Sequence, residues 1–359
     1  MTGTALTLSG HLELLWQAAV RGDEAAATRA ALGALEAGIP AQDVLLDLIA
    51  PVQRRVGEEW AANRLTVAQE HAASAINDRA VAALSHHVTP RPTPGGKGRI
   101  TVACVDGEWH GLPARLLAEV LKLRGWQVDY LGAQVPADHL IAHVHHTGPD
   151  LVALSSSIPT RLPTAHATIT AVQATATPVL VGGAAFGAQG QYAALLGADA
   201  WAPDARAAAD RLDRAPLPRP AAAHQPIDDL PHLTDQEYTL VTRSSPQLVR
   251  AVMDGLDERF PAMRHYTAAQ REHTAQDTAH IVDFLATALY VGDSGLFTTF
   301  ITWTADILSA RDVPAHALLP ALGLLGDQLK DFPRALSLLR QASDRLTASE
   351  TADLTGEPA

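Results

Sequence analysis

The stretch RITVACVDGEWHGLP (99–113) joins an apolar run to a polar loop that contains two glycines. The run 99–105 ends at Asp-Gly, so we expect a buried β-strand there. Pro113 suits the first position of a helix, and the apolar segment after it stops at Gly125, a residue type that terminates helices. The stretch therefore predicts a strand, a loop and a helix in succession.

The same alternation continues along the chain on the C-terminal side. Further apolar runs predict strands at 126–131, 150–155, 178–183 and near Ala200, with helices between them. Continuous apolar strands that alternate with helices are typical of a parallel, doubly wound sheet, here of the flavodoxin-like kind. Ligands of such sheets bind outside the carboxyl ends of the strands, which is where the loop 106–112 is expected.

Two segments rich in proline, 86–98 and 214–231, separate this sheet from its neighbours. The first part reads as four helices, near 9–20, 23–37 and 41–60 and from Thr66, where TVAQ forms a capping box. Short connections predict a four-helix bundle. The last part reads as all helix, in runs separated by Pro, Gly or Asp. We expect a multidomain α and α/β protein with domains at 1–88, 99–213 and 232–346.

The composition of the chain excludes several classes of function. The chain has 359 residues, a formal net charge of −12 and one cysteine, Cys104. An acidic chain without a Lys/Arg run is a poor nucleic-acid binder, so we expect no nucleic-acid partner. A single cysteine excludes a disulfide framework and a cysteine-based zinc site. No apolar run is long enough to span a membrane and no signal peptide is evident, so we expect a cytoplasmic protein without a membrane partner.

The loop after the first strand contains a candidate metal ligand. His110, flanked by Gly111, is able to present an imidazole nitrogen to a metal ion. Asp106 or Glu108 is able to hold the other ring nitrogen and fix the tautomer. Taken alone, the loop is better explained as an exposed polar connection.

Small residues end the third and fourth strands. Ser155 and Ser157 follow one strand, and Gly182 and Gly183 end the next, which leaves room for a thin ligand group. Together with Glu108-x-His110, they resemble the cobalamin-binding domain of corrinoid enzymes, with Pro113 where that family has glycine. The resemblance implies that His110 is the lower cobalt ligand and that the small residues admit the nucleotide tail of the cofactor.

The predicted bundle contains a second motif. Trp60 closes the third helix, and Glu70-His71 lie in the first turn of the fourth, so all three cluster at one end. Helix geometry alone favours a core tryptophan and an exposed Glu-His pair. The spacing resembles that of cobalamin-dependent light-sensing transcription factors, which implies that these residues surround the 5′-deoxyadenosyl group above cobalt. Ala61 stands where those proteins place a histidine, and their DNA-binding domain is not evident here.

Residues with ligand chemistry also gather in the last part of the chain: Arg264, Tyr266, His273, Asp277, His280 and Trp303. Their helical spacing puts His273, Asp277 and His280 on one face. A planar, nitrogen-rich ligand suits this set, and so does a plain aromatic core with a surface pair. Nearly the whole chain resembles the photocobilins, in which a globin-like domain follows the cobalamin module. That resemblance implies biliverdin beside adenosylcobalamin, held without a thioether; haem on His273 or His280 is the alternative.

These observations favour a photoreceptor that is not an enzyme. Adenosylcobalamin and biliverdin serve as chromophores, and the signal passes through a light-dependent homo-oligomer or a separate effector protein. A corrinoid methyl carrier, with His110 in the same role, is the alternative.

Overall fold

The computed structural model describes residues 7–88, 96–220 and 230–355 of the chain. Parts of both predicted linkers, 89–95 and 221–229, lie outside these ranges. The chain divides into two compact units, Met1–Pro226 and Ile227–Ala359. The expected bundle and sheet fall within the first unit, because they share one hydrophobic core.

The first unit begins with the expected bundle. Its helices are α1 (Leu8–Arg21), α2 (Glu24–Glu36), a third helix made of α3 (Ala41–Asp43), η1 (Val44–Ile49) and α4 (Ala50–Ala61), and α5 (Val67–His87). The capping box is confirmed, since Thr66 Oγ1 accepts from the Gln69 amide and Gln69 Oε1 accepts from the Thr66 amide. The third helix is π-helical over η1, which the sequence pattern did not predict. Pro51, which lacks an amide hydrogen, is the second residue after it.

The sheet is parallel throughout its described strands, in the order β2-β1-β3-β4-β5. Its strands are β1 (Arg99–Cys104), β2 (Gln127–Gly132), β3 (Leu151–Ser155), β4 (Val179–Gly182) and β5 (Ala200–Ala202). Its helices are α6 (Gly111–Leu123), α7 (Ala137–Thr147), α8 (Leu162–Gln173), α9 (Gln191–Leu195) and α10 (Ala205–Arg214), with short 3-10 turns η2 (Pro159–Arg161) and η3 (Ala184–Phe186). The flavodoxin-like order is confirmed, and the chain reverses direction across the sheet between β1 and β3, where such folds bind ligands.

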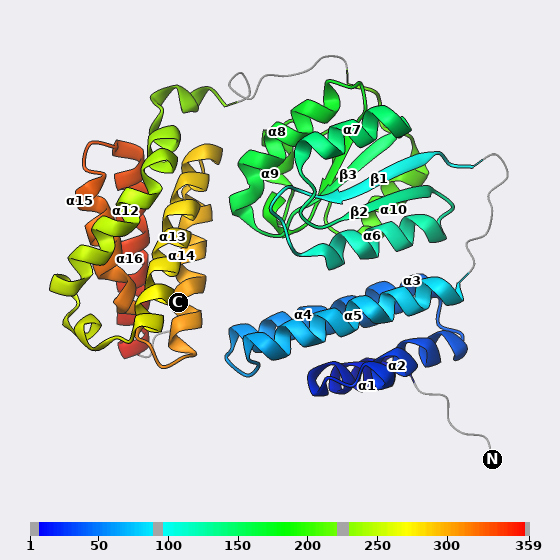
Figure 1. Ribbon diagram of the computed structural model, residues 1–359, viewed down its shortest axis with the longest axis horizontal. Coiled ribbons are helices and arrows are strands. Elements are labelled where there is room, and N and C mark those ends of the chain that lie inside the picture. Colours follow the sequence, from blue (N-terminus) through cyan, green and yellow to red (C-terminus); the bar gives the residue numbers. More distant parts are fainter. Residues whose placement is uncertain (1–6, 89–95, 221–229, 356–359) are drawn as a thin grey trace. The chain divides into compact units, whose positions relative to one another are not determined.

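Helices cover both faces of the sheet, with α6 and α10 on one side and α7 and α8 on the other (Figure 1). The side with α6 and α10 packs on the bundle. Arg124 Nε donates to Gln42 Oε1 over 2.7 Å, and Arg206 pairs with Asp43 and Asp47 at 3.1 and 2.7 Å. The bundle and the sheet are therefore joined by both apolar packing and ion pairs.

The second unit is helical over its described residues. Its elements are η4 (Pro231–Asp235), α12 (Glu237–Arg259), η5 (Pro261–His265), α13 (Ala268–Val291), α14 (Ser294–Ser309), η6 (Ala315–Leu318), α15 (Leu319–Gln328) and α16 (Pro333–Thr355). The expectation that Pro246 separates two helices is wrong, because α12 runs through it. Packing of α12 against α13 and α15 outweighs the one hydrogen bond that proline removes.

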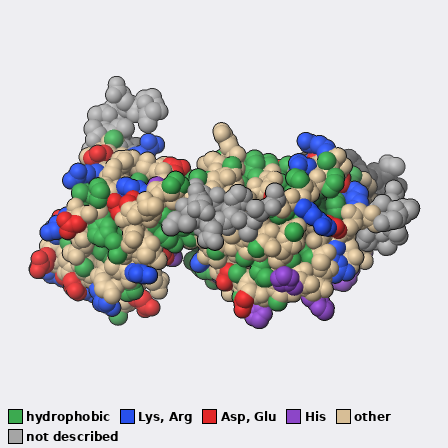
Figure 2. All heavy atoms as spheres, turned by 90° about the horizontal axis from the view of Figure 1, so that it is seen from above, with side chains coloured by type: hydrophobic (Ala, Val, Ile, Leu, Met, Phe, Trp, Pro, Cys, Tyr) green, Lys and Arg blue, Asp and Glu red, His purple; other side chains and the backbone are tan. Residues whose placement is uncertain are grey.

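Charges of both signs are mixed on the surface, and the described helices have no long apolar segment, as the composition suggested. Figure 2 shows Lys and Arg side chains interspersed with Asp and Glu over the visible face of the described residues. Within 7–88, 96–220 and 230–355, no helix has both the length and the apolar character needed to cross a membrane.

Candidate functional site

The loop between β1 and α6 is built around one buried carboxylate. The side chain of Glu108 is fully buried, and its Oε1 lies 2.7 Å from His110 Nδ1 and accepts from the His110 amide over 2.9 Å. Its Oε2 accepts from the amides of Ser157 and Ile158, at 2.7 and 3.0 Å, and from Ser156 Oγ at 3.1 Å. Every hydrogen bond of this carboxylate thus fixes either the histidine or the loop after β3.

The charge of Glu108 follows from these contacts. Burial opposes ionisation, but hydrogen bonds from the side chain and amide of His110 and from the Ile158 and Ser157 amides lower the pKa of Glu108 to about 2. An ionised carboxylate at Nδ1 favours the tautomer with hydrogen on Nδ1. The lone pair of His110 then lies on Nε2, the nitrogen that faces away from Glu108.

The outer nitrogen of His110 has a partner that the sequence pattern did not predict. Trp109 Nε1 donates to His110 Nε2 over 3.0 Å. The indole is 59% exposed and the His110 side chain 46% exposed, so both groups reach solvent. The donor-only indole confirms Nε2 as the acceptor nitrogen, and a metal ion at Nε2 requires this hydrogen bond to break.

The remaining residues of the loop support its shape. Of the two carboxylates considered for His110, Glu108 makes the contact. Gly111 begins α6, and its carbonyl accepts from Tyr130 Oη over 3.2 Å. Cys104 is buried beside the His110 carbonyl, and burial, with a smaller effect of Glu108, raises the pKa of its thiol to about 12. Cys104 is therefore a packing residue rather than a reactive thiol.

Small residues follow β3 and β4 at the same edge of the sheet. Cys104 pairs with Ser155, and Ser155 with Gly182, so the three loops share this edge. Gly183 has φ +99°, and a Cβ atom there would lie 2.2 Å from the carbonyl oxygen of Ser156. Close backbone packing thus requires Gly183, and a role for Gly182 and Gly183 in a cofactor slot stays a prediction.

The three predicted bundle residues do lie at one end of the helices. Trp60 is the penultimate residue of α4, is half-buried and packs against the shared core. Glu70 Oε2 lies 2.6 Å from His71 Nδ1, and its Oε1 accepts from Ser74 Oγ over 2.7 Å. The His71 side chain is 74% exposed. The acidic and imidazole groups therefore form a fixed pair at the solvent end of the bundle.

A chain of hydrogen bonds, not foreseen from the sequence, connects this pair to the bundle core. Ser74 Oγ accepts from Gln53 Nε2 over 2.7 Å, and Gln53 Oε1 accepts from Asn77 Nδ2 over 2.9 Å. Asn77 is fully buried. Glu70 is thus held through side chains of both α4 and α5.

The end of the bundle extends past the carboxyl edge of the sheet. Helix α5 packs against α6, which begins at Gly111, and the Tyr130 hydroxyl donates to the Gly111 carbonyl over 3.2 Å. Burial, with smaller effects of Cys104 and Asp78, raises the pKa of Tyr130 to about 12. Arg124, beyond the other end of α6, contacts Gln42. Glu70 precedes Asp78 by eight residues, or about 12 Å along a helix. In Figure 1 the turn that joins α4 to α5 extends past the start of α6, and Glu70 and His71 lie next to this turn, in the first turn of α5.

The six bilin candidates lie on the surface of the second unit. His273, Asp277 and His280 are exposed on α13, and in the part of the chain that the structure describes no hydrogen bond or ion pair joins them. Trp303 on α14 is 46% exposed and lies 6.3 Å from the ring of Phe300. The predicted common face of α13 is thus present, but it is not closed into a cavity by contacts among these residues.

Arg264 and Tyr266 belong to the turn before α13. Arg264 Nε donates to the carbonyl of Asp257 over 3.1 Å, and the Tyr266 ring meets Phe260 edge-on at 6.3 Å. These contacts tie the turn to the end of α12.

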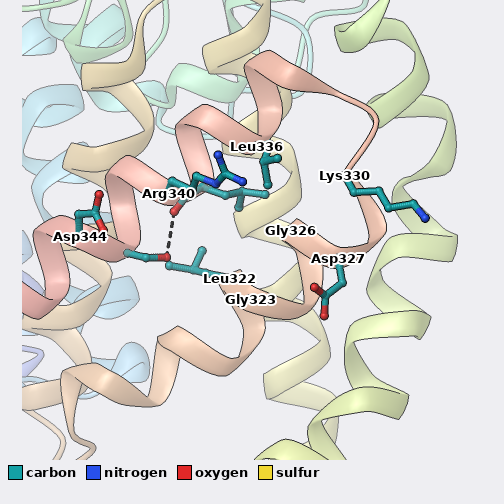
Figure 3. Close-up of a pocket in the computed structure, with 10 residues that line it drawn as sticks. Leu322, Gly323, Gly326, Asp327, Lys330, Leu336, Arg340 and Asp344 are labelled. Atoms are coloured by element: carbon teal, nitrogen blue, oxygen red, sulfur yellow. Dashed lines mark hydrogen bonds between the residues drawn. The ribbon is translucent and has the colours of Figure 1, made fainter.

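Two cavities of the second unit involve other residues. The first, of about 560 Å³, lies between α15 and α16 (Figure 3). It is lined by Leu322, Gly323, Gly326, Asp327, Lys330, Leu336, Leu339, Arg340, Ser343 and Asp344. The second, of about 320 Å³, is lined by Leu240, Ser244, Gln247, Leu248, Gln328, Leu329 and Phe332. None of the six bilin candidates lines either cavity. No group of three metal-binding side chains occurs among the described residues either, so His110 stands as a single candidate ligand.

Comparison with known proteins agrees with this architecture. Residues 98–212 match the model of a B12 binding domain, and residues 11–85 match a second model with the same description. The chain is 35% identical over 155 residues to the HTH-type transcriptional repressor CarH of Myxococcus xanthus, covering 42% of this chain and 50% of CarH. It is 37% identical over 123 residues to the repressor CarA of the same organism, covering 33% and 41%.

A solved structure shows the same fold. The Methanosarcina barkeri monomethylamine corrinoid protein matches 58% of this chain and all of its own chain, with a TM-score of 0.51 and 21% identity. The chain spans half or less of the two curated relatives, which are named as repressors and not as enzymes. Both relatives are HTH-type transcriptional repressors. The expectation that this chain has no nucleic-acid partner is therefore not supported by the comparison. The first unit therefore combines a helical region and a parallel α/β domain that are both similar to B12-binding domains.

Proposed function

We propose that this chain is a photoreceptor that binds adenosylcobalamin at the carboxyl edge of the sheet, below the end of the bundle. The observation that carries the proposal is the Glu108–His110 pair. A fully buried carboxylate orients the imidazole at the reversal point between β1 and β3, and Nε2 faces outward. A single neutral imidazole held by a carboxylate is a suitable donor for cobalt.

The residues present fit the cofactor on both sides. His110 is the lower ligand, and Glu108 keeps Nδ1 protonated and the ring in place. Trp60 and the Glu70–His71 pair, on the end of the bundle that extends past the edge, would cover the upper face of the cofactor and hydrogen-bond the adenosyl sugar. Bound adenosylcobalamin supplies a cobalt–carbon bond that visible light cleaves.

The signal passes through the contacts between bundle and sheet. If light removed a group held against Trp60, the bundle would be free to shift against α6 and α10, where Arg124 and Arg206 join the two parts. This movement biases a homo-oligomer or the binding of a separate effector protein. Ala61 carries no side chain that could bind a metal, so His71 would be the protein group available for that purpose at this end of the bundle, with water as the alternative.

The second unit adds a further chromophore in this proposal. Biliverdin lies against the α13–α14 face, where Asp277 accepts from pyrrole N–H groups, and Arg264, in the turn before α13, pairs with a propionate. The only cysteine, Cys104, is buried in β1, so the bilin is held without a thioether. A globin-like unit that binds haem through His273 or His280 is the rival, and a Soret band identifies it.

A corrinoid methyl carrier is the second candidate for the first unit, because a corrinoid protein shares its fold. Trp60 argues against it, since an indole over the upper face obstructs methyl exchange. Dark alkylation of cobalt by a methyl donor, without a spectral response to green light, is the result that favours the carrier.

The test is reconstitution of the full chain with adenosylcobalamin in the dark, followed by desalting. We expect retained cofactor, a spectral change under green light and a change in oligomer size. His110→Ala loses the histidine-ligated spectrum, whereas His139→Ala, on the exposed side of α7, does not. A colourless wild-type protein, or a spectrum that green light leaves unchanged, overturns the proposal.

A separate experiment tests the bilin. Co-expression with a source of biliverdin produces a red-absorbing band that denaturation releases into solvent, since no covalent bond holds the pigment. Absence of the band removes the bilin and leaves the cobalamin proposal intact.

A further inference from the structure

A guanidinium lies against the loop of His110. Arg161 ends η2, directly after the residues that bind Glu108. A Cβ atom at Gly107 would lie 2.9 Å from Arg161 Nη1, 3.0 Å from Cζ and 3.3 Å from Nε, so the plane of the guanidinium rests on this glycine. Gly107, with φ +76°, both shapes the loop and makes room for the arginine.

This arginine lacks the partners that other arginines of the unit have. Arg161 Nε is buried without a hydrogen-bond acceptor, and in the described part of the chain the guanidinium forms no ion pair. The oxygens of Glu108 are occupied by other donors. By contrast, Arg124 and Arg206 each pair with two aspartates. A partly buried cation without an anion is unfavourable, so a ligand anion is the missing partner.

The position of Arg161 selects the kind of anion. Its turn η2 packs against η3, which follows Gly183, and its side chain covers the loop after β1. Arg161 therefore lies where the loops after β1, β3 and β4 meet, at the reversal point of the sheet. Arg115, the other arginine near this edge, is engaged with Glu119 and with the ring of Tyr130.

We propose that Arg161 binds the phosphodiester of the nucleotide loop of cobalamin. This rests on the proposed cobalamin site. Cobalamin carries one phosphodiester, between the corrin side chain and the ribose, and a guanidinium binds a phosphate through two parallel hydrogen bonds. Arg161 thus makes the site specific for the complete cofactor over corrinoids that lack the nucleotide.

The experiment measures dissociation constants of the full chain for cobalamin and for cobinamide, which lacks the phosphate, ribose and base. Arg161→Met weakens cobalamin binding at least tenfold and leaves cobinamide binding within twofold of wild type. Arg161→Lys, which keeps the charge but not the planar fork, gives an intermediate loss for cobalamin only. Arg79→Met, on the bundle and paired with Glu24, changes neither constant.

A second readout reports on the phosphate itself. The ³¹P resonance of bound cobalamin differs between wild type and Arg161→Met, while thermal melting of the ligand-free proteins coincides. Equal weakening of both corrinoids, or an unchanged ³¹P shift, overturns the role of Arg161. If wild type binds neither corrinoid, the cobalamin proposal itself has failed, which is a different result from a variant that loses selectivity.

Discussion

The loop of His110 and the α13–α14 face are both rich in ligand chemistry, yet they are built differently. In the loop, Glu108 is fully buried, and both of its carboxylate oxygens accept hydrogen bonds from His110 or from the segment 156–158. On α13, His273, Asp277 and His280 are exposed side chains on a regular helix.

The difference lies in what holds each group in place. The Glu108 carboxylate connects two loops of the sheet, so the local fold depends on it and the imidazole is oriented before any ligand arrives. The α13 face needs none of its polar groups to fold, because α13 is held by buried residues such as Val282 and Leu285. Substitutions should therefore damage stability in the first region and only ligand binding in the second.

The largest effect is expected at Glu108. Glu108→Ala leaves the Ser157 and Ile158 amides and the Ser156 hydroxyl without their acceptor, and removal of one member of a buried, hydrogen-bonded charged group costs about 3–5 kcal/mol. Urea denaturation followed by circular dichroism measures this loss. Glu13→Ala, at an exposed pair with Arg55, is the control and should change stability far less, because solvent screens an exposed ion pair. Equal losses in the two variants contradict a structural role for Glu108.

A smaller loss is expected at Gly183. Gly183→Ala forces an alanine to φ +99° and puts its Cβ against the Ser156 carbonyl. Backbone strain of this kind costs about 1–3 kcal/mol, and the clash adds to it by displacing the loop that binds Glu108. Gly38→Ala is the matched control, because Gly38 has φ +89° and no atom within 4 Å of the added Cβ. Thermal unfolding should show a larger loss for Gly183→Ala than for Gly38→Ala; identical losses exclude the clash.

Local sequence pattern predicted most of the fold, and the two features that it missed depend on tertiary packing. Apolar strands between helices predicted the parallel sheet, and Thr66 with Gln69 predicted the start of α5. The π-helical stretch Val44–Ile49 and the continuation of α12 through Pro246 were not predicted. Both depend on how neighbouring helices pack, which periodicity within one segment does not encode.

The sequence predicted only part of the candidate site. The pairing of Glu108 with His110 was predicted as one of two options, because Asp106 and Glu108, four and two residues before His110, both lie in its loop. Trp109 and Arg161 were missed, since each acts on a group in the folded loop, at His110 Nε2 and at Gly107. Such contacts join backbone turns whose geometry is set by the sheet, so residue type and spacing carry no signal for them.

A moderate change in cobalamin affinity is expected from a substitution at Trp109, on the same loop as His110. Trp109→Phe removes the indole N–H that occupies His110 Nε2, a hydrogen bond worth about 0.5–1.5 kcal/mol. Because this bond must break before a metal binds at Nε2, the variant should bind cobalamin about two- to tenfold more tightly. Isothermal titration measures the change. Trp303→Phe on α14 serves as the control for loss of an exposed indole, and weaker cobalamin binding by Trp109→Phe contradicts a competing role of the indole.

The smallest effect on stability is expected on the α13 face. Asp277→Ala and His280→Ala replace exposed side chains without hydrogen bonds or ion pairs among the described residues, so the free energy of unfolding should change by about 0.5 kcal/mol or less. Phe297→Ala, in the core of the same unit, should cost about 3–5 kcal/mol. In the biliverdin co-expression experiment, the two surface variants should lose the red band while remaining folded. If a surface variant loses as much stability as Phe297→Ala, the proposed difference between the two regions is wrong. The polar side chains of α13 would then stabilise the fold, as Glu108 does in its loop.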